Sequence, residues 1–169
     1  MSQASNKVKW CLNKARRELE KSDLHRGLVK VEEDSKLAEQ HIIKAEHNLK
    51  AAIYFEKGGF SDWSASAFFY CVYHCFLAIL RKFGYESRNQ ECTIALIEHL
   101  KEEGKISLSQ EIIEAVKAVD TEERHETNVI SLRENFQYGT ATSIEDKKLE
   151  ELKNLCRKAI DETKKIIYK

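Results

Sequence analysis

The chain contains no proline in 169 residues, where average usage of about 5% predicts roughly eight. Proline removes a backbone donor and breaks helices, and in sheets it is confined to edges and bulges. Its absence therefore takes the strongest stop signal out of every segment of the chain. Glycine, the other common helix breaker, occurs only six times. This pattern favours long helices that end at glycines.

Apolar residues recur at intervals of three and four along most of the chain, which is the pattern of one buried helical face. Asp34 or Ser35 can cap the second helix through a side-chain oxygen, and the Gly58–Gly59 pair can end it. The segment 61–83 is apolar on nearly every side, so it is expected at the centre. The expected helices cover residues 6–20, 34–57, 61–83, 89–103, 107–119 and 143–167.

The connections between these helices are short, which favours antiparallel neighbours. No segment alternates polar and apolar residues for long enough to predict a strand. The polar stretch 120–128 is compatible with a helix or a loop, and both stay open. We therefore predict an all-α fold, an up-and-down antiparallel bundle of five or six helices.

Charge is distributed unevenly along the chain. The 28 basic and 28 acidic residues cancel, which excludes a chain-wide electrostatic footprint for nucleic acid. Residues 1–30 nevertheless carry eight Lys or Arg side chains against three acidic ones. We predict that residues 1–30 form a basic N-terminal helical arm and that residues 31–169 form the bundle domain. Arg16 and Arg17 of the arm are candidates for RNA contact, although a basic helix face can also serve solubility alone.

Targeting signals are absent from the first residues, which hold no apolar run followed by a small-residue cleavage site. A cytoplasmic location is therefore expected. The five cysteines are an odd number without a compact framework, which favours reduced and mostly buried thiols. The longest apolar stretch, residues 68–80, is interrupted by His74. It is shorter than the roughly 20 residues of a membrane-spanning helix, so it is expected in the core, with no membrane as a partner.

Cys71, His74 and Cys75 have helical spacing and share one face, where they could provide three zinc ligands. A fourth ligand is missing and the neighbouring residues are apolar, which favours buried thiols beside a hydrogen-bonded histidine. No phosphate-binding glycine motif or serine-hydrolase motif occurs. We therefore expect neither a metal nor another cofactor. The other histidines lie in polar surroundings and are expected to face solvent: His25, His41, His47, His99 and His125.

His74 also aligns with Tyr70 one turn before it and with Arg81 two turns after it. This alignment predicts a polar strip in the bundle, where His74 either satisfies the core or, if the protein is active, carries a proton. The aromatic residues between positions 60 and 76 cover more than one helix face. Most of them are expected in the core, with the excess available for a subunit interface.

The block from Gly58 to Leu100, GGFSDWSASAFFYCVYHCFLAILRKFGYESRNQECTIALIEHL, resembles the HEPN domain family. In this family a glycine-rich turn leads into an aromatic-rich central helix. The resemblance extends back through HIIKAEHNLKAAIYFEKG and forward to RENFQYG, and so covers roughly residues 37–139. It implies an up-and-down bundle that is often a homodimer. Many members are ribonuclease toxins or partners of a small nucleotidyltransferase, and others bind nucleotides or RNA without catalysis.

Catalytic members of the family carry an arginine followed by a histidine four to six residues later. The matching arginine here is Arg133, and Tyr138 stands where the histidine is expected. No histidine follows Arg133 in the chain. Metal-free RNA cleavage needs groups that exchange protons near pH 7, which histidine does at a pKa of about 6.5 and tyrosine, at about 10, does not.

The resemblance therefore implies a non-catalytic or degenerate binding module that engages RNA, a nucleotide or a partner nucleotidyltransferase. Arg133, Asn135 and Tyr138 are expected to line a cleft between two subunits, where Arg133 can hold a phosphate and Tyr138 can stack on a base. With a nucleotidyltransferase as partner, the Tyr138 hydroxyl is a group that could be modified. The alternative is a metal-independent endoribonuclease toxin, with Arg133, Tyr138 and His74 as candidate catalytic residues. A third interpretation pairs Arg133 with Glu134 and packs Tyr138 at a helix end.

Overall fold

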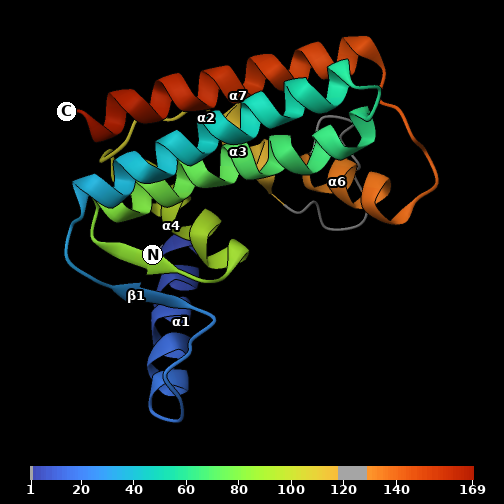
Figure 1. Ribbon diagram of the computed structural model, residues 1–169. Helices are drawn as coiled ribbons and strands as arrows, with labels where there is room; N and C mark the ends of the chain where they lie inside the picture. Colours follow the sequence, from blue (N-terminus) through green and yellow to red (C-terminus); the bar gives the residue numbers. More distant parts are fainter. Residues whose placement is uncertain (1, 118–128) are drawn as a thin grey trace.

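The computed structural model describes residues 2–117 and 129–169, and helices dominate these residues (Figure 1). The predicted all-α class is confirmed. The alternatives for residues 120–128 lie outside the described residues, as does the prediction for His125. The elements are α1 (Gln3–Leu19), β1 (Leu28–Lys30), α2 (Ser35–Lys57), α3 (Ser61–Lys82), β2 (Tyr85–Ser87), α4 (Gln90–Glu102), α5 (Gln110–Val116), α6 (Val129–Tyr138) and α7 (Asp146–Ile167).

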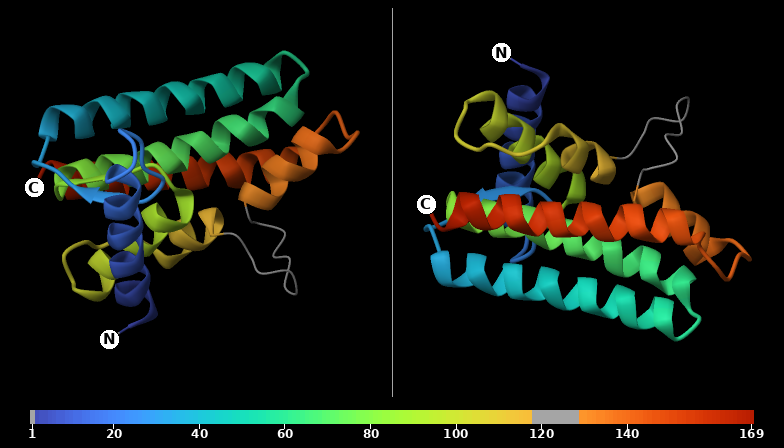
Figure 2. Two further views of the ribbon diagram at one scale, coloured as in Figure 1. Left: turned by 90° about the horizontal axis from the view of Figure 1, so that it is seen from below. Right: turned by 90° about the horizontal axis from the view of Figure 1, so that it is seen from above.

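Helix α3 is the centre of the bundle, as predicted. The long helices α2 and α7 lie beside it, and α4, α5 and α6 also pack against it (Figures 1 and 2). Thirteen of its 22 residues are buried, among them Phe68 and Phe76. Within the described residues α3 is the one helix long and apolar enough to cross a membrane, and 61% of its most apolar window is buried inside the protein. Contact with five other helices accounts for this composition without a membrane.

The α2–α3 hairpin follows from local sequence signals. Asp34 caps α2, since its Oδ1 atom accepts a hydrogen bond of 2.8 Å from the Leu37 amide. Gly58 follows the helix, and Gly59 has a φ of +82°, a left-handed conformation that favours glycine. The chain then reverses into α3 within three residues. Both signals were predicted from the sequence and both are confirmed.

The predicted starts of two later helices are wrong by three residues. Helix α5 starts late because the Ser109 hydroxyl donates a hydrogen bond of 2.6 Å to Glu162 and does not cap the helix. Helix α7 starts late because the Ile144 amide donates to the Ser61 hydroxyl at 2.9 Å, which keeps the buried Ile144 out of the helix. These partners lie 53 and 83 residues away in the chain, so a local sequence pattern cannot predict them. Helix α6, which was not expected as a separate element, lies between the two.

Strands β1 and β2 pair residues 28–30 with residues 85–87 in an antiparallel sheet, so the prediction of no strand is wrong. With three residues each, they are too short for an alternating pattern to show in the sequence. A Cβ atom on Gly27, just before β1, would lie 2.5 Å from the Cys11 carbonyl oxygen. Only glycine allows this close approach to α1. The arm predicted over residues 1–30 thus ends in a strand, and the domain boundary at residue 30 stays a prediction.

Helix α1 lies across the direction of the long helices and packs on α4 (Figures 1 and 2). A disulfide between Cys11 and Cys92 joins these two helices, which corrects the expectation of reduced thiols for this pair. The two cysteines are 81 residues apart in the sequence, and only the packing of α1 on α4 brings them together. Cys71, Cys75 and Cys156 are free and buried, as predicted.

Candidate functional site

Helix α6 places Arg133 against the core helix α3. The guanidinium carbon lies 4.4 Å from the centroid of the Phe69 ring, which is a cation–π distance. The Phe69 ring stacks in turn on Tyr73, with centroids 5.6 Å apart, and meets Tyr70 edge-on. The buried Nε atom of Arg133 has no hydrogen-bond partner in the described part of the chain. Arg133 therefore packs on the Phe69 ring and, within the described residues, forms no ion pair with Glu134.

Asn135 and Tyr138 lie on other sides of α6. Both are exposed, and Tyr138 keeps 81% of its surface accessible. At about 100° per residue, Tyr138 lies roughly 140° and Asn135 roughly 160° around the helix from Arg133. Since Arg133 faces α3, the three predicted residues do not form one cluster within a single chain. Their cleft between two subunits stays a prediction.

His74 is hydrogen-bonded, as predicted, and its partner is His41 on α2. The two Nδ1 atoms lie 3.0 Å apart and the ring centroids 5.2 Å apart. Burial, together with smaller contributions from the neighbouring His74 and Arg81, lowers the pKa of His41 to about 4. Burial and the charge of Lys44 also lower the pKa of His74. Both rings are therefore neutral at pH 7.

The expectation that His41 faces solvent is wrong, because its ring is half-buried beside His74. Sequence analysis missed this contact, although a signal for it exists. The two histidines lie 17 and 15 positions from the Gly58–Gly59 turn, and folding two helices back at that turn brings such positions side by side. His47 is exposed as predicted, whereas His99 is half-buried beside Glu103.

The zinc alternative gains no support from the described residues. Cys71 interacts with Cys156 of α7, whereas His74 turns to α2. The hydrogen bond with Cys156, together with burial, raises the pKa of Cys71 far above its usual range, so this thiol stays protonated. No group of three or more His, Cys, Asp or Glu side chains suited to a metal ion occurs in the part of the chain that the structure describes.

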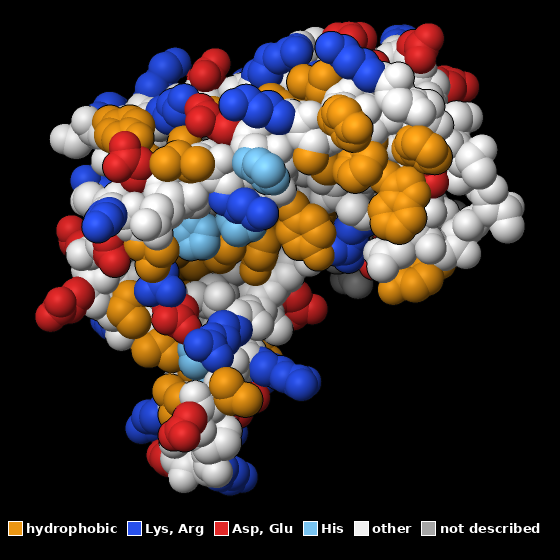
Figure 3. All heavy atoms as spheres, viewed as in Figure 1, with side chains coloured by type: hydrophobic (Ala, Val, Ile, Leu, Met, Phe, Trp, Pro, Cys, Tyr) orange, Lys and Arg blue, Asp and Glu red, His pale blue; other side chains and the backbone are white. Residues whose placement is uncertain are grey.

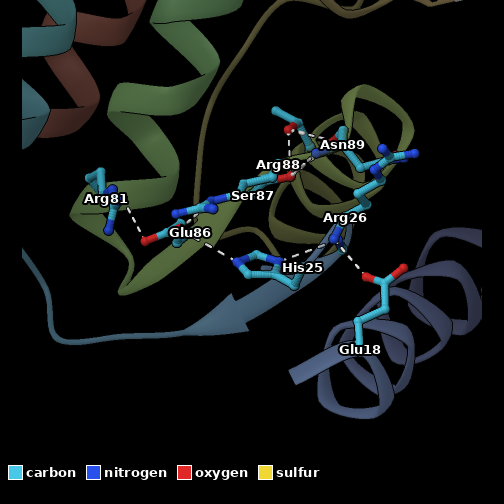
Figure 4. A network of polar contacts seen from close by, with 10 residues as sticks. Glu18, His25, Arg26, Arg81, Glu86, Ser87, Arg88 and Asn89 are labelled. Carbon is cyan, nitrogen blue, oxygen red and sulfur yellow. Dashed lines mark hydrogen bonds and ion pairs between the residues drawn. The ribbon is translucent and has the colours of Figure 1, made fainter. Parts of the chain in front are cut away.

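Glu86 on β2 contacts basic side chains from three segments of the chain (Figure 4). It accepts hydrogen bonds of 3.0 Å from both Arg81 and Arg88, and His25 Nε2 lies 3.4 Å from it. Burial opposes ionisation, but these donors outweigh it and hold the pKa of Glu86 below its ordinary value. His25 is only 7% exposed, so the expectation that it faces solvent is wrong. In the same loop, the Arg26 backbone amide donates a hydrogen bond of 2.6 Å to Glu18 of α1, which connects the loop to that helix.

A cavity of about 260 Å³ opens beside this network. It lies where α2, the end of α3 and the β2 segment meet, so it adjoins both the Glu86 cluster and the His41–His74 contact. Its polar lining residues are His41, Arg81, Tyr85, Glu86, Ser87 and Arg88.

The arm presents a separate basic surface on α1. Trp10 is 47% exposed, and its ring centroid lies 4.6 Å from Lys7 Nζ and 5.3 Å from Lys14 Nζ. The spacing of three and four residues places these side chains on one helix face. Arg16 and Arg17 are exposed in the last turn of α1, where their charges also complement the helix dipole. Sequence analysis missed Trp10, although its spacing from the two lysines is visible in the sequence.

The α2–α3 hairpin exposes four aromatic side chains, which we call the aromatic face: Tyr54 (76%), Phe60 (59%), Trp63 (61%) and Tyr70 (45%). Figure 3 shows hydrophobic side chains gathered over this part of the molecule. Among the other aromatic residues of α3, Phe68, Phe69 and Phe76 are buried. Of the seven aromatic residues between positions 60 and 76, three are buried, Tyr73 is half-buried and three are exposed, so the exposed part is larger than expected.

Two comparisons with known proteins complete this description. The family model described as HEPN domain matches residues 38–167. The match includes α7, beyond the resemblance seen in residues 37–139, and it leaves α1 and β1 outside. No curated protein matches the chain.

Proposed function

We propose, from the premise that this chain belongs to the HEPN domain family, that it binds RNA without cleaving it. One observation carries this proposal: Arg133 is held on the Phe69 ring, while Tyr138, at the position of the family's histidine, is exposed on another side of α6. The phosphate-holding half of the family motif is present. The half that moves protons is not, because a tyrosine hydroxyl does not exchange protons near pH 7.

The position of Arg133 suits a phosphate ligand. A guanidinium that lies on an aromatic ring keeps the N–H donors at its edge available for two parallel hydrogen bonds to a phosphate. The Nε–H of Arg133 has no partner within the described residues, and an unpaired buried donor costs about 1–3 kcal/mol. Because Nε is buried, a ligand oxygen would approach the guanidinium through its outer N–H groups.

The arm supplies a second contact for RNA. An exposed indole can stack on a base, which is worth about 1–3 kcal/mol, whereas each exposed cation–π contact is worth about 0.5–1 kcal/mol. A base can therefore displace Lys7 and Lys14 from the Trp10 ring and leave both ammonium groups to the phosphates. Lys7 also pairs with Glu91 at 2.9 Å, but an exposed ion pair of this kind is weak.

Affinity for a short single-stranded RNA, measured over a range of salt concentrations, tests the proposal. Trp10→Ala is expected to weaken binding about tenfold through lost stacking. Tyr168→Ala, which removes an exposed aromatic side chain at the end of α7, is the matched control and leaves affinity unchanged. Replacing Lys7 and Lys14 together by Gln lowers the salt slope by about 1.4. An affinity that does not change with salt contradicts the proposal.

We also propose that two copies of the chain pair through the aromatic face. Exposed aromatic side chains of this density are typical of protein interfaces, and they lie on one hairpin, so a twofold pairing can bury all of them. Molecular mass in solution tests this. The wild type is expected as a dimer, and Trp63→Ser combined with Tyr70→Ser as a monomer. Trp10→Ser is the matched control, and a monomeric wild type contradicts the pairing.

A small nucleotidyltransferase is the proposed protein partner, and the feature that favours it is the Tyr138 hydroxyl. Tyr138 is 81% exposed, so an enzyme can reach it. In this reaction the Tyr138 oxygen would take a nucleoside monophosphate from a nucleoside triphosphate, with loss of the hydroxyl proton and release of pyrophosphate. Co-expression with a nucleotidyltransferase encoded beside this protein is expected to add the mass of this nucleotide to the wild type and not to Tyr138→Phe. An unmodified wild type that also fails to bind that enzyme contradicts this partnership.

A further inference from the structure

The contact between His41 and His74 fixes the tautomers of both rings. A hydrogen bond between two Nδ1 atoms 3.0 Å apart needs a hydrogen on one nitrogen and a lone pair on the other. In the neutral pair, one ring therefore carries its hydrogen on Nδ1 and has a bare Nε2, while the other ring carries its hydrogen on Nε2. The pair as a whole keeps one acceptor and one donor beyond this hydrogen bond, and His41 is the ring that lines the cavity.

One added proton changes this pair in a defined way. The bare Nε2 takes the proton, the hydrogen bond between the Nδ1 atoms is kept, and the pair becomes a monocation with two Nε2–H donors. Charged N–H donors are the preferred partners of anionic oxygens. Burial lowers the pKa of both His41 and His74, so the pair does not take up this proton alone at pH 7. An anion bound beside it makes the uptake favourable.

The charges around the pair favour an anion over a metal ion. Lys44 and Arg81 act on the two rings from α2 and α3, and both would repel a divalent cation. The described residues also provide no third ligand for a metal. The other charged or titratable groups that line the cavity with His41 are Tyr85 and Glu86, and Glu86 is paired with Arg81 and Arg88.

We propose that the cavity beside His41 binds a phosphate group, free or as a monoester, and that the His41–His74 pair takes up one proton on binding. The cavity measures about 260 Å³, below the range of about 300–1,000 Å³ usual for small-molecule sites, so it suits a compact anion better than a nucleoside. Arg81, Arg88 and Ser87 line it and add donors. Glu86 also lines it, but two arginines already compensate its charge.

This site is separate from the surfaces assigned above. Tyr70, the aromatic-face residue nearest to the cavity along α3, is 11 residues from Arg81, which is about 17 Å at 1.5 Å per residue. The described residues that line the cavity include none from the aromatic face and none from α1. The inference therefore stands whether or not α1 binds RNA and whether or not two copies pair.

Histidine side-chain NMR during an acid titration, without and with inorganic phosphate, tests the proposal directly. Phosphate that binds the protonated pair tenfold more tightly raises the titration midpoint of His41 and His74 by about one pH unit. His47 is the internal control, since it is exposed on the same helix, and its midpoint stays in place. Sulfate, which does not itself titrate near neutral pH, is expected to give the same shift.

Affinity for inorganic phosphate provides the second readout. His41→Gln and His74→Gln are each expected to weaken binding about tenfold, and His47→Gln leaves it unchanged. Arg88→Gln is expected to weaken phosphate binding while keeping the histidine pair intact. Because Arg88 is exposed, this substitution is not expected to unfold the protein.

An RNA with a 5′-phosphate that binds more tightly than its 5′-hydroxyl form identifies a monoester as the ligand, and equal binding identifies free phosphate. Unmoved His41 and His74 midpoints overturn the proposal, as does a shift shared by His47.

Discussion

Helices α3 and α1 differ in the share of their residues that is buried. Helix α3 buries thirteen of its 22 residues, and α1 buries four of its 17. The family match contains α3 and excludes α1. What fixes the fold is therefore concentrated in the part shared with the family, whereas α1 leaves Trp10 and its basic side chains exposed and is attached to the bundle at a few points. The comparison separates a region that stabilises the fold from a region whose exposed side chains we propose for RNA contact.

The largest effect is expected in the core. Phe68 of α3 is fully buried, so Phe68→Ala removes its contacts and leaves a cavity, which lowers the free energy of unfolding by about 3–5 kcal/mol. Denaturant unfolding measures this. Ile43→Ala, at an exposed position of α2, is the control, with a change within about 0.5 kcal/mol. Equal losses in the two variants would show that α3 does not carry the fold.

The attachment of α1 is expected to contribute somewhat less. The Cys11–Cys92 disulfide closes a loop of about 80 residues, and a disulfide typically gives about 2–4 kcal/mol of stabilisation. Reductant should lower the unfolding free energy of the wild type by this amount. It should not affect the double variant with Ala at both positions.

Thiol counting checks the same bond. Three free thiols are expected per unfolded, unreduced chain, from Cys71, Cys75 and Cys156. Disulfides are rare in the cytoplasm, where we expected this protein on sequence grounds. Five free thiols in protein isolated with its thiols blocked would contradict the bond.

Acid is expected to weaken the α2–α3 contact by a smaller amount. The pKa of His41 is lowered to about 4 in the folded protein, from about 6.5, so the unfolded chain takes up the proton first. Stability is therefore present above pH 6.5 and is lost as the pH falls toward 4. Because the ring is partly exposed and screened, we expect a loss of about 1 kcal/mol between pH 7 and 5. Unfolding of His41→Gln should lack this part of the pH dependence, and identical slopes would exclude the contact as its source.

The smallest effect is expected at Tyr138. Its side chain is 81% exposed and has no hydrogen bond within the described residues, so Tyr138→Phe should change the unfolding free energy by less than about 0.5 kcal/mol. Thermal unfolding measures this. A larger loss would mean that Tyr138 is part of the fold and not a free hydroxyl.

Local signals made much of this fold predictable. The Asp34 cap, the Gly58–Gly59 turn and the apolar run of α3 each depend on neighbours in sequence. The Cys11–Cys92 bond does not, because it needs α1 to pack on α4 before the sulfurs meet.

The candidate site was less predictable for the same reason. Arg133 and Tyr138 could be identified from their spacing, but their directions depend on which face of α6 packs on α3. The partner of His74 depends on the hairpin register, and that of His25 on the pairing of two three-residue strands.

Incubation of labelled RNA with the purified protein, followed by separation of bound, free and cleaved RNA, tests the central claim most directly. We predict salt-sensitive binding with the RNA intact, and weaker binding by Arg133→Ala. Cleavage by the wild type that is lost in Arg133→Ala would contradict the account and establish a ribonuclease in spite of Tyr138.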